Sequence, residues 1–469
     1  MITKGQTKLT EIPGSIVAPR GFRACGVFCD IKRVGTGKGS NKGQKRDLAL
    51  VMSVVPAAVA GTFTTNQVCA APVKLCAARV RKGRAQAIVI NSGNANACTG
   101  NPGMKDALEM VRFTEQALGL PGGSVLVGST GRIGVALPMD NVRAGILEAA
   151  AALGATARHA ADAAEAIMTS DTRRKQIAVQ FNLNGRTVRI GGICKGAGMI
   201  QPGMSASGHR PAATLRHATM LCFITTDAAI QAETLQSALN EAVANSFNRI
   251  TVDGDMSTND TVLVLANGLA GSPRSAADSP QSTARSQKLP SAQHPSPITG
   301  RKSVEFKAFQ AALSHVCLEL AKMIVRDGEG VTRFVTVRVK GAKSFAHADA
   351  AARAVANSAL VKTSWHGGDP NWGRIIAALG YSPARVVEQN VDVGYSAPAS
   401  RNILWSLKDG QPTKAGFKEL CAAVAPTEFD LHINLNLGQA GALIYAADLT
   451  EQYVEFNKGD IHDPNSLGG

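Results

Sequence analysis

The sequence predicts an α/β fold in which sheets are layered with helices. Short β-branched apolar segments and stretches of helical periodicity follow one another along the 469 residues. Aromatic residues make up only 4% of the chain, whereas glycine occurs 47 times. We therefore expect a core of Ala, Val, Ile and Leu with many tight turns, in a chain long enough for two core-forming units. This composition favours an α/β enzyme over a binding scaffold that depends on aromatic anchors.

Short runs of apolar residues bounded by turn-forming residues predict the strands. The expected strands cover 18–27, 47–53, 87–90, 124–128, 176–181, 187–193, 219–227, 332–340, 428–437 and 442–445. Helical periodicity predicts helices over 104–118, 144–166, 232–245, 306–325 and 346–357. A further helix is expected to start at Asp369, because Asp369-Pro370 is an N-cap and first-turn signal. Asn184-Gly185 predicts a type I′ turn between the two strands that precede Lys195.

Two segments are expected outside the packed core. The loop 31–46 is rich in Gly, Lys and Ser, and 271–302 is rich in Ser, Pro, Gln and Ala without apolar periodicity, so the latter is expected to be a disordered insertion. The first segment carries much of the formal charge of +15. Because no aromatics are interleaved there, we interpret it as a solvated basic loop and not as a nucleic-acid surface. The same charge would mildly favour an acidic substrate.

The nine cysteines are an odd number without a Cys-x-x-Cys pair, which predicts reduced, mostly buried thiols in an intracellular protein and no zinc site. The first 17 residues contain Glu11, no arginine and no apolar core segment, so they make a poor secretory or mitochondrial address. No segment is expected to span a membrane. We expect a cytoplasmic protein, with the mitochondrial matrix as the alternative.

A candidate nucleophile stands at the start of the apolar strand 219–227. Thr219 follows a glycine-rich turn at Lys195-Gly196-Ala197-Gly198, and its hydroxyl would lie at a strand end. A threonine hydroxyl needs a neighbouring base; cleavage before Thr219 would supply its own α-amine, whose pKa is about 8. Residue types alone favour the alternative of an ordinary strand-edge threonine.

A second candidate feature is Thr130-Gly131, at the end of the expected strand 124–128. Gly131 lets the backbone amide turn inward and Thr130 offers a hydroxyl beside it. Two such donors could form an oxyanion hole, each contributing roughly 3 kcal/mol when aimed at the developing charge. Ser-Thr-Gly is also a common turn.

Three other polar motifs have a structural alternative. The stretch 91–97 is either a polar floor for a ligand or an Asx-rich turn that holds itself together. The acids of 253–261 lack EF-hand spacing, so we interpret them as a hydrogen-bonded structural loop and not as a metal site. His366 could be a base, but no Gly-x-Ser-x-Gly elbow accompanies it, which favours a loop histidine.

The residues around the candidate nucleophile resemble the signature of a known family. Lys195-Gly196-x-Gly198-Met199-Ile200-x-Pro202 and Ala218-Thr219-Met220-Leu221-x-Phe223-Ile224-Thr225-Thr226-Asp227 are similar to motifs of the ornithine acetyltransferase family, the bifunctional glutamate N-acetyltransferases of arginine biosynthesis. The resemblance covers nearly the whole chain. It implies the layered α/β sandwich of the self-cleaving, N-terminal-nucleophile type, and an enzyme that needs no cofactor or metal.

The resemblance also assigns site residues. It implies cleavage between Ala218 and Thr219, and an oxyanion hole at Thr130 and Gly131. The substrate contacts it implies are Thr169, with Thr172 as the alternative, Lys195 for a carboxylate, Glu329 for an amine, Thr219 and Asn457. His462 occupies the position of a family threonine, which puts the amino-acid specificity in question.

The implied reaction is a ping-pong transfer of an acetyl group from N-acetylornithine to glutamate through Thr219, with acetyl-CoA as a donor in some family members. Residues 1–218 and 219–469 would be two interdigitated chains that pair into a heterotetramer. A self-cleaving amidohydrolase or aminopeptidase that passes the acyl group to water is the rival class, and an unprocessed, inactive homologue is a third. The insertion 205–217 bears on the third, because it precedes the cut and contains a second Ala-Thr bond at Thr214. We favour Thr219, because only Thr219 runs straight into an apolar strand.

Overall fold

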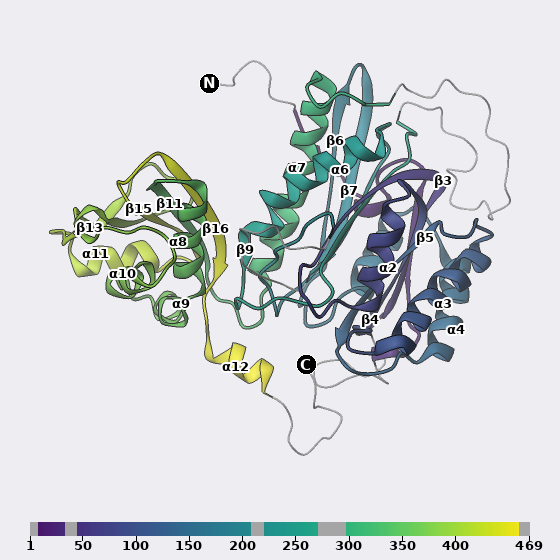
Figure 1. Ribbon diagram of the computed structural model, residues 1–469, viewed down its shortest axis with the longest axis horizontal. Coiled ribbons are helices and arrows are strands. Elements are labelled where there is room, and N and C mark those ends of the chain that lie inside the picture. The colour runs from purple at the N-terminus through teal and green to yellow at the C-terminus, as the bar shows by residue number, and fades with distance from the viewer. Residues whose placement is uncertain (1–7, 33–44, 208–219, 271–296, 459–469) are drawn as a thin grey trace.

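The computed structural model describes residues 8–32, 45–207, 220–270 and 297–458. Within these residues the chain forms two lobes, each built on its own sheet (Figure 1). Nine strands make the sheet of the first lobe and seven make that of the second. Helices pack on both sheets, so the predicted layered α/β class is confirmed.

The strand order of the first sheet is β1-β6-β7-β8-β10-β3-β4-β5, with β2 paired to β3. Its members are β1 (Thr10–Glu11), β2 (Phe22–Val27), β3 (Leu48–Phe63), β4 (Arg84–Asn94), β5 (Val125–Arg132), β6 (Lys175–Leu183), β7 (Arg186–Lys195), β8 (Leu221–Thr226) and β10 (Thr261–Ala266).

The long strand β3 divides this sheet into two facing layers. Its first part pairs with β2 and β4 and its last part pairs with β10, with a register shift between Met52 and Ala57 on the β4 side. Small residues let the layers approach closely: a Cβ on Gly128 of β5 would lie 3.0 Å from the ring of Phe223 in β8. Strand β8 is thus buried on both faces, with Phe223 in one hydrophobic core and Ile224 in the other.

Helices cover the outer side of each layer (Figure 1). On one side lie α2 (Ala71–Val80), α3 (Gly100–Leu118), α4 (Met139–Ala152) and α5 (Ala157–Ala166); on the other lie α6 (Ala232–Ala244) and α7 (Val304–Arg326). Helix α7 is long and apolar enough to cross a membrane by length and composition alone. Its apolar face, including Phe309, Leu313 and Leu320, is buried in the core over β6 and β7.

The second lobe has the strand order β14-β13-β12-β15-β11-β16-β9. The strands are β9 (Ile250–Thr251), β11 (Phe334–Ala342), β12 (Asp392–Ser396), β13 (Leu404–Lys408), β14 (Gln411–Pro412), β15 (Glu428–Asn434) and β16 (Ala440–Ala447). The helices are α8 (Phe345–Asn357), α9 (Ala359–His366), α10 (Trp372–Gly380), α11 (Phe417–Val424) and α12 (Glu451–Asn457). Strand β9 comes from the middle of the chain and joins the edge at β16, which ties the two lobes together.

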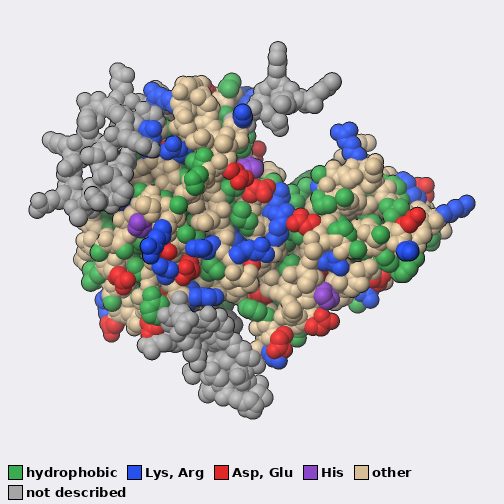
Figure 2. All heavy atoms as spheres, turned by 180° about the vertical axis from the view of Figure 1, so that it is seen from behind, with side chains coloured by type: hydrophobic (Ala, Val, Ile, Leu, Met, Phe, Trp, Pro, Cys, Tyr) green, Lys and Arg blue, Asp and Glu red, His purple; other side chains and the backbone are tan. Residues whose placement is uncertain are grey.

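A hollow between the lobes gathers Lys and Arg side chains (Figure 2). It has a volume of about 600 Å³, and its lining includes Arg249, Arg338 and Lys340. Arg249 forms an ion pair with Asp349, and Arg338 forms one with Asp430 at 2.9 Å. Much of its positive charge is therefore neutralised, and no residue of the predicted active site lines it.

Several local predictions are wrong in their boundaries. The expected helix 144–166 is two helices, because Gly154 leaves the helix to form a β-bridge with Ala24. Helix α10 does not start at Asp369; its N-cap is Asn371, whose side chain accepts a hydrogen bond from Arg374 N at 3.1 Å. The hairpin turn is confirmed, since both Asn184 and Gly185 have positive φ.

The expected flexible segments extend less far than predicted at their ends. Ile298 bridges Ile230 and is 7% exposed, so the insertion beginning at 271 ends before this residue. Lys32 is buried and donates to Arg46 O at 2.7 Å; burial lowers its pKa to about 8. Arg46, at the other end of the loop, forms ion pairs with Asp162 and Glu165. The rest of both segments, 271–296 and 33–44, lies outside the described residues.

Candidate active site

The candidate site lies at the end of the first sheet where the central strand β8 begins. Lys195, at the end of β7, pairs with Leu221 in β8, and Leu221 pairs in turn with Thr261 in β10. Thr261 also pairs with Phe63 at the end of β3, which bridges Ser205. Ala218 and Thr219, the predicted cleavage site, lie outside the described residues. The described chain before and after these two residues, at Ser205 and at Leu221, therefore lies at the same end of the sheet.

Asp260 anchors Met220, the residue directly before β8. The carboxylate oxygen Oδ1 of Asp260 accepts a short hydrogen bond from Met220 N, while Oδ2 is buried and has no hydrogen-bond partner among the described residues. Burial raises the pKa of Asp260 well above its ordinary value, against the opposing effects of backbone hydrogen bonds and of Lys195. The carboxyl group of Asp260 thus holds Met220, the residue that follows Thr219 in the sequence.

Thr130 and Gly131 lie where the sequence places them, at the end of β5. Thr130 is 1% exposed. Gly131 has a φ of +129°, and a Cβ there would lie 2.4 Å from the carbonyl carbon of Gly93. Only glycine fits this position, because a side chain would overlap the neighbouring strand.

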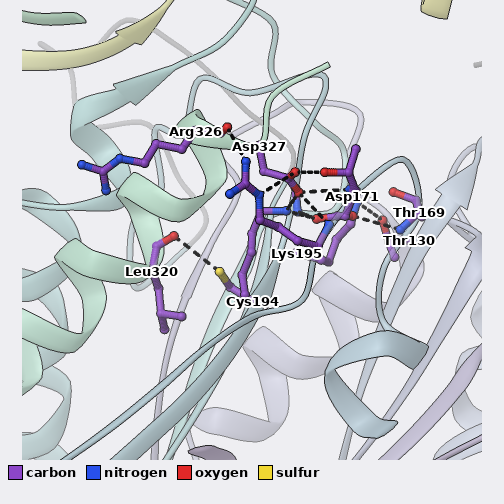
Figure 3. A network of polar contacts seen from close by, with 12 residues as sticks. Thr130, Thr169, Asp171, Cys194, Lys195, Leu320, Arg326 and Asp327 are labelled. Atoms are coloured by element: carbon purple, nitrogen blue, oxygen red, sulfur yellow. Dashed lines mark hydrogen bonds and ion pairs between the residues drawn. The ribbon is translucent and has the colours of Figure 1, made fainter. Parts of the chain in front are cut away.

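Lys195 reaches across the two layers to Thr130. Lys195 Nζ donates to Thr130 Oγ1 at 3.3 Å, and both side chains are buried (Figure 3). An ammonium group only donates, so the hydroxyl hydrogen of Thr130 remains available for another acceptor. Burial lowers the pKa of Lys195, and nearby Asp171 opposes this effect.

Thr169 lies in the loop between α5 and β6 (Figure 3). Its backbone N–H donates to Asp171 Oδ2 at 3.0 Å, which leaves its hydroxyl available to a ligand. The alternative, Thr172, uses its hydroxyl on Asp327. Of the two, only Thr169 has a hydroxyl that makes no hydrogen bond to a described residue, so it stays the predicted substrate contact.

Glu329 and Asn457 meet at the opposite side of the glycine-rich turn. Glu329 N donates to Ala197 O at 2.9 Å, and a Cβ on Gly198 would lie 2.3 Å from a carboxylate oxygen of Glu329. Asn457 Nδ2, at the end of α12, donates to Glu329 Oε2 at 2.9 Å. Gly198 thus leaves the space that Glu329 fills. His462 lies outside the described residues.

A buried ion cluster of Asp171, Lys175 and Asp327 supports this site, and it was not predicted from the sequence. Asp171 lies in the same motif as Thr169, which is a partial signal. Lys175 and Asp327 are 152 residues apart, and no local pattern indicates that they meet.

The amide-rich stretch after β4 is a self-supporting turn. Asn91 Nδ2 donates to Asn94 O at 2.9 Å, Asn94 Nδ2 donates to Val135 O at 3.0 Å, and Asn96 Nδ2 donates to Gly103 O at 2.8 Å. These side-chain amides bind backbone carbonyls and are fully buried. The structure therefore supports the Asx-rich turn for 91–97 and not the polar floor for a ligand.

The acidic motif 253–261 is also structural. Asp253 accepts hydrogen bonds from Met199 N at 2.6 Å and Ile200 N at 2.7 Å, which fixes the glycine-rich turn. Asn259 Nδ2 donates to Ala95 O at 2.6 Å and Ser129 O at 2.8 Å, which joins the two layers. The predicted role as a hydrogen-bonded loop beside the site is confirmed.

His366 ends helix α9 and is not a loop residue. Its ring lies 3.2 Å from Thr332 Oγ1, 3.4 Å from Asp448 and 3.1 Å from Glu451. These contacts connect α9 to the start of α12. Neither Thr130 nor Gly131 is among its hydrogen-bond partners, and Thr219 lies outside the described residues.

The fold and the site together define a layered α/β enzyme with a hydroxyl, a positive-φ glycine and a buried amine at one end of its central strands. Residues 31–459 match the model of the ArgJ family. The chain is 47% identical to the arginine biosynthesis bifunctional protein ArgJ of Symbiobacterium thermophilum, covering 95% of this chain and 98% of that protein. It is 42% identical to the glutamate N-acetyltransferase of Methanocaldococcus jannaschii, with the same coverage. The chain belongs to the ArgJ family.

Among solved structures, ornithine acetyltransferase from Mycobacterium tuberculosis, in complex with ornithine, is 37% identical. The match covers 42% of this chain and all of that chain, with a TM-score of 0.38.

Proposed function

We propose that this chain transfers an acetyl group from N2-acetylornithine to glutamate, through an acetyl ester on Thr219, in arginine biosynthesis. The observation that carries the proposal is the contact between Lys195 Nζ and Thr130 Oγ1 at 3.3 Å. It lies at the end of the sheet where β8 begins, two residues after Thr219 in the sequence. Two relatives named above, an ArgJ bifunctional protein and a glutamate N-acetyltransferase, support the same reaction.

The charges around the turn suit an amino-acid head group. Lys195 can hold a carboxylate with its ammonium group, and Glu329 can hold an amine through a charge-assisted hydrogen bond. Thr169 and Asn457 would complete the pocket from two other segments. Both substrates, N-acetylornithine and glutamate, carry an α-carboxylate.

The proposed chemistry has two half-reactions. Thr219 Oγ attacks the acetyl carbonyl while the α-amine of Thr219 takes its proton; ornithine then leaves with that proton. The amine of glutamate attacks the acetyl ester in the second half, and the oxygen of Thr219 regains its proton. Thr130 Oγ1–H and the Gly131 N–H stabilise the oxyanion in both, and the bond from Lys195 polarises the Thr130 hydroxyl.

The nucleophile would be freed by self-cleavage between Ala218 and Thr219. Met220, directly after the cut, binds Asp260, and the nearest described anchor before the cut is Ser205, which bridges Phe63. Such tethering favours attack by Thr219 on the preceding carbonyl. The proposal includes two interdigitated chains, 1–218 and 219–469, paired into a heterotetramer in the cytoplasm, and acetyl-CoA as a second donor.

Two measurements test the proposal. Initial rates at varied donor and acceptor should give parallel double-reciprocal lines; intersecting lines would remove the acetyl enzyme. Amino-terminal sequencing should give Thr-Met-Leu-Cys for the second chain, whereas Thr-Leu-Arg-His would move the nucleophile to Thr214. An intact chain of 48.7 kDa without acetyl transfer would refute the proposal. Ornithine release at full rate without glutamate would favour the hydrolase.

A further inference from the structure

Three charged side chains meet in the interior beneath the candidate active site. Lys175 Nζ lies 2.6 Å from Asp171 Oδ1 and also binds Asp327 Oδ2 (Figure 3). All three side chains are at most 1% exposed. Burying ions is costly unless they are paired and hydrogen-bonded in good geometry. Here two carboxylates share one ammonium group. Both carboxylates can therefore accept further hydrogen bonds from other donors.

The remaining capacity of both carboxylates goes to segments that carry candidate substrate contacts. Asp171 accepts from Thr169 N at 3.0 Å and from Gly196 N, next to Lys195, at 2.8 Å.

Asp327 makes the corresponding contacts on the other side of the cluster. It accepts from Thr172 N at 3.1 Å, and it lies two residues before Glu329. Arg173 Nε adds a contact of 3.4 Å to Asp327 Oδ1 from the surface. One ion cluster thus joins the loop before β6, the end of β7 and the loop after α7.

We propose that Asp171, Lys175 and Asp327 are positioning residues, which fix the spacing of Thr169, Lys195 and Glu329. None of the three is assigned to touch the substrate. The inference rests on the proposed function for the identity of that substrate, an α-amino acid or its N-acetyl derivative.

The charge of Lys195 depends on the groups that face it. Burial lowers the pKa of Lys195, and Lys175 on β6 lowers it further. Asp171 is the largest opposing influence, followed by Glu329 after α7 and Asp260 before β10. Loss of the Asp171 charge would therefore make Lys195 lose its proton at a lower pH.

The first test is Asp171→Asn, which keeps the shape and one acceptor but removes the charge. KM for N-acetylornithine and glutamate should rise by about 10-fold. Turnover of p-nitrophenyl acetate, which has no amino-acid head group, should change by less than about threefold at pH 7. The alkaline limb of kcat/KM against pH should move to lower pH with either substrate, because Lys195 binds Thr130 in both reactions.

Glu428→Gln is the matched control. Glu428 pairs with Arg326 at 2.7 Å, directly before Asp327, but both side chains of this pair are 36% exposed. This substitution removes a carboxylate that pairs with Arg326 and not with Lys175. KM and the alkaline limb of the kcat/KM profile should therefore stay unchanged.

If Asp171→Asn does not fold, the triple variant Asp171→Asn, Lys175→Met, Asp327→Asn replaces the whole cluster by neutral side chains of similar size. Its KM and alkaline limb should change in the same directions. The inference would be overturned if kcat/KM fell equally for the amino-acid and ester substrates and the alkaline limb did not move. That result would show that the cluster only supports the fold. A wild-type protein that turns over the ester but transfers no acetyl group to glutamate would refute the proposed function; the ester pH profiles would still decide the role of the cluster.

Discussion

Asn457 Nδ2 donates a hydrogen bond of 2.9 Å to Glu329 Oε2, which joins the last described helix to the loop after α7 across 128 residues of sequence. Helix α12 follows the sheet of the second lobe, whereas Glu329 contacts the glycine-rich turn of the first. The proposed pocket therefore needs both lobes in place. The four predictions below concern the residues at this junction and at the sheet edge beside it.

Asn457→Ala should weaken amino-acid binding. Loss of a hydrogen bond to a charged group costs about 1.5–3 kcal/mol, so KM for glutamate should rise by about 10- to 150-fold with kcat nearly unchanged. Steady-state kinetics with varied glutamate measures this. The matched control is Glu455→Ala on the same helix, since Glu455 pairs only with Lys458 at the surface among the described residues. A fall in kcat alone would assign Asn457 to chemistry instead.

Gly131→Ala should damage both fold and catalysis. The new Cβ would lie 2.4 Å from Gly93 and 2.5 Å from Asn94 backbone atoms. We expect a loss of about 2 kcal/mol or more in the free energy of unfolding, and about 100-fold lower acetyl transfer if the protein folds. Gly119→Ala is the control, because Gly119 also has positive φ but has nothing within 4 Å of the added carbon. It should cost only about 1 kcal/mol in urea unfolding. Equal costs for both variants would contradict the crowding at Gly131.

The pH profile of kcat/KM should be bell-shaped. The α-amine of Thr219 must be neutral, so activity rises as pH increases through a pKa of about 8. Lys195 must be protonated, and because burial lowers its pKa, activity should fall at a lower pH than an ordinary lysine would cause. Lys195→Arg should reduce activity but remove the alkaline limb, since arginine stays protonated. An alkaline limb that persists in Lys195→Arg would assign this ionisation to another group.

Asp260→Asn should be tolerated, whereas Asp260→Ala should not. Asparagine keeps an acceptor for Met220 N; alanine leaves that donor unsatisfied, at a cost of about 1–3 kcal/mol. The pKa of Asp260 is raised in the folded state, so wild-type protein binds a proton there that the unfolded chain releases above a pH of about 4. The contribution of Asp260 to the free energy of unfolding of the wild type therefore falls as pH rises above that value.

The asparagine variant lacks this ionisation, so its Tm relative to wild type should be higher at pH 8 than at pH 5. Calorimetric scans at both pH values measure the difference. A constant difference in Tm would mean that folding does not raise the pKa of Asp260.

Local sequence patterns predicted the elements that carry the site. The apolar run after Thr219 is the fully buried strand β8, and Asn184-Gly185 makes the turn that delivers Lys195. Thr130 and Gly131 end β5 as expected. These features depend on residues a few positions apart, through side-chain alternation and the freedom of glycine at positive φ.

Other local features needed the rest of the molecule. Gly154 interrupts a helical pattern because Ala24, far away in sequence, offers it a β-bridge. His366 closes a helix and binds residues at the start of α12, although its motif predicted a loop. In both cases a contact with a distant segment outweighed the local propensity.

The sequence by itself determined the class of fold, the strand that follows the predicted cleavage site and most of the residues around it. Only the tertiary structure decided that Lys195 binds Thr130 across two layers, and that Asp171, Lys175 and Asp327 form one buried cluster. Periodicity and turn signals report interactions between near neighbours in the chain. The pairing of buried charges is different, because it depends on which distant segments pack together, and burial then makes their partners obligatory.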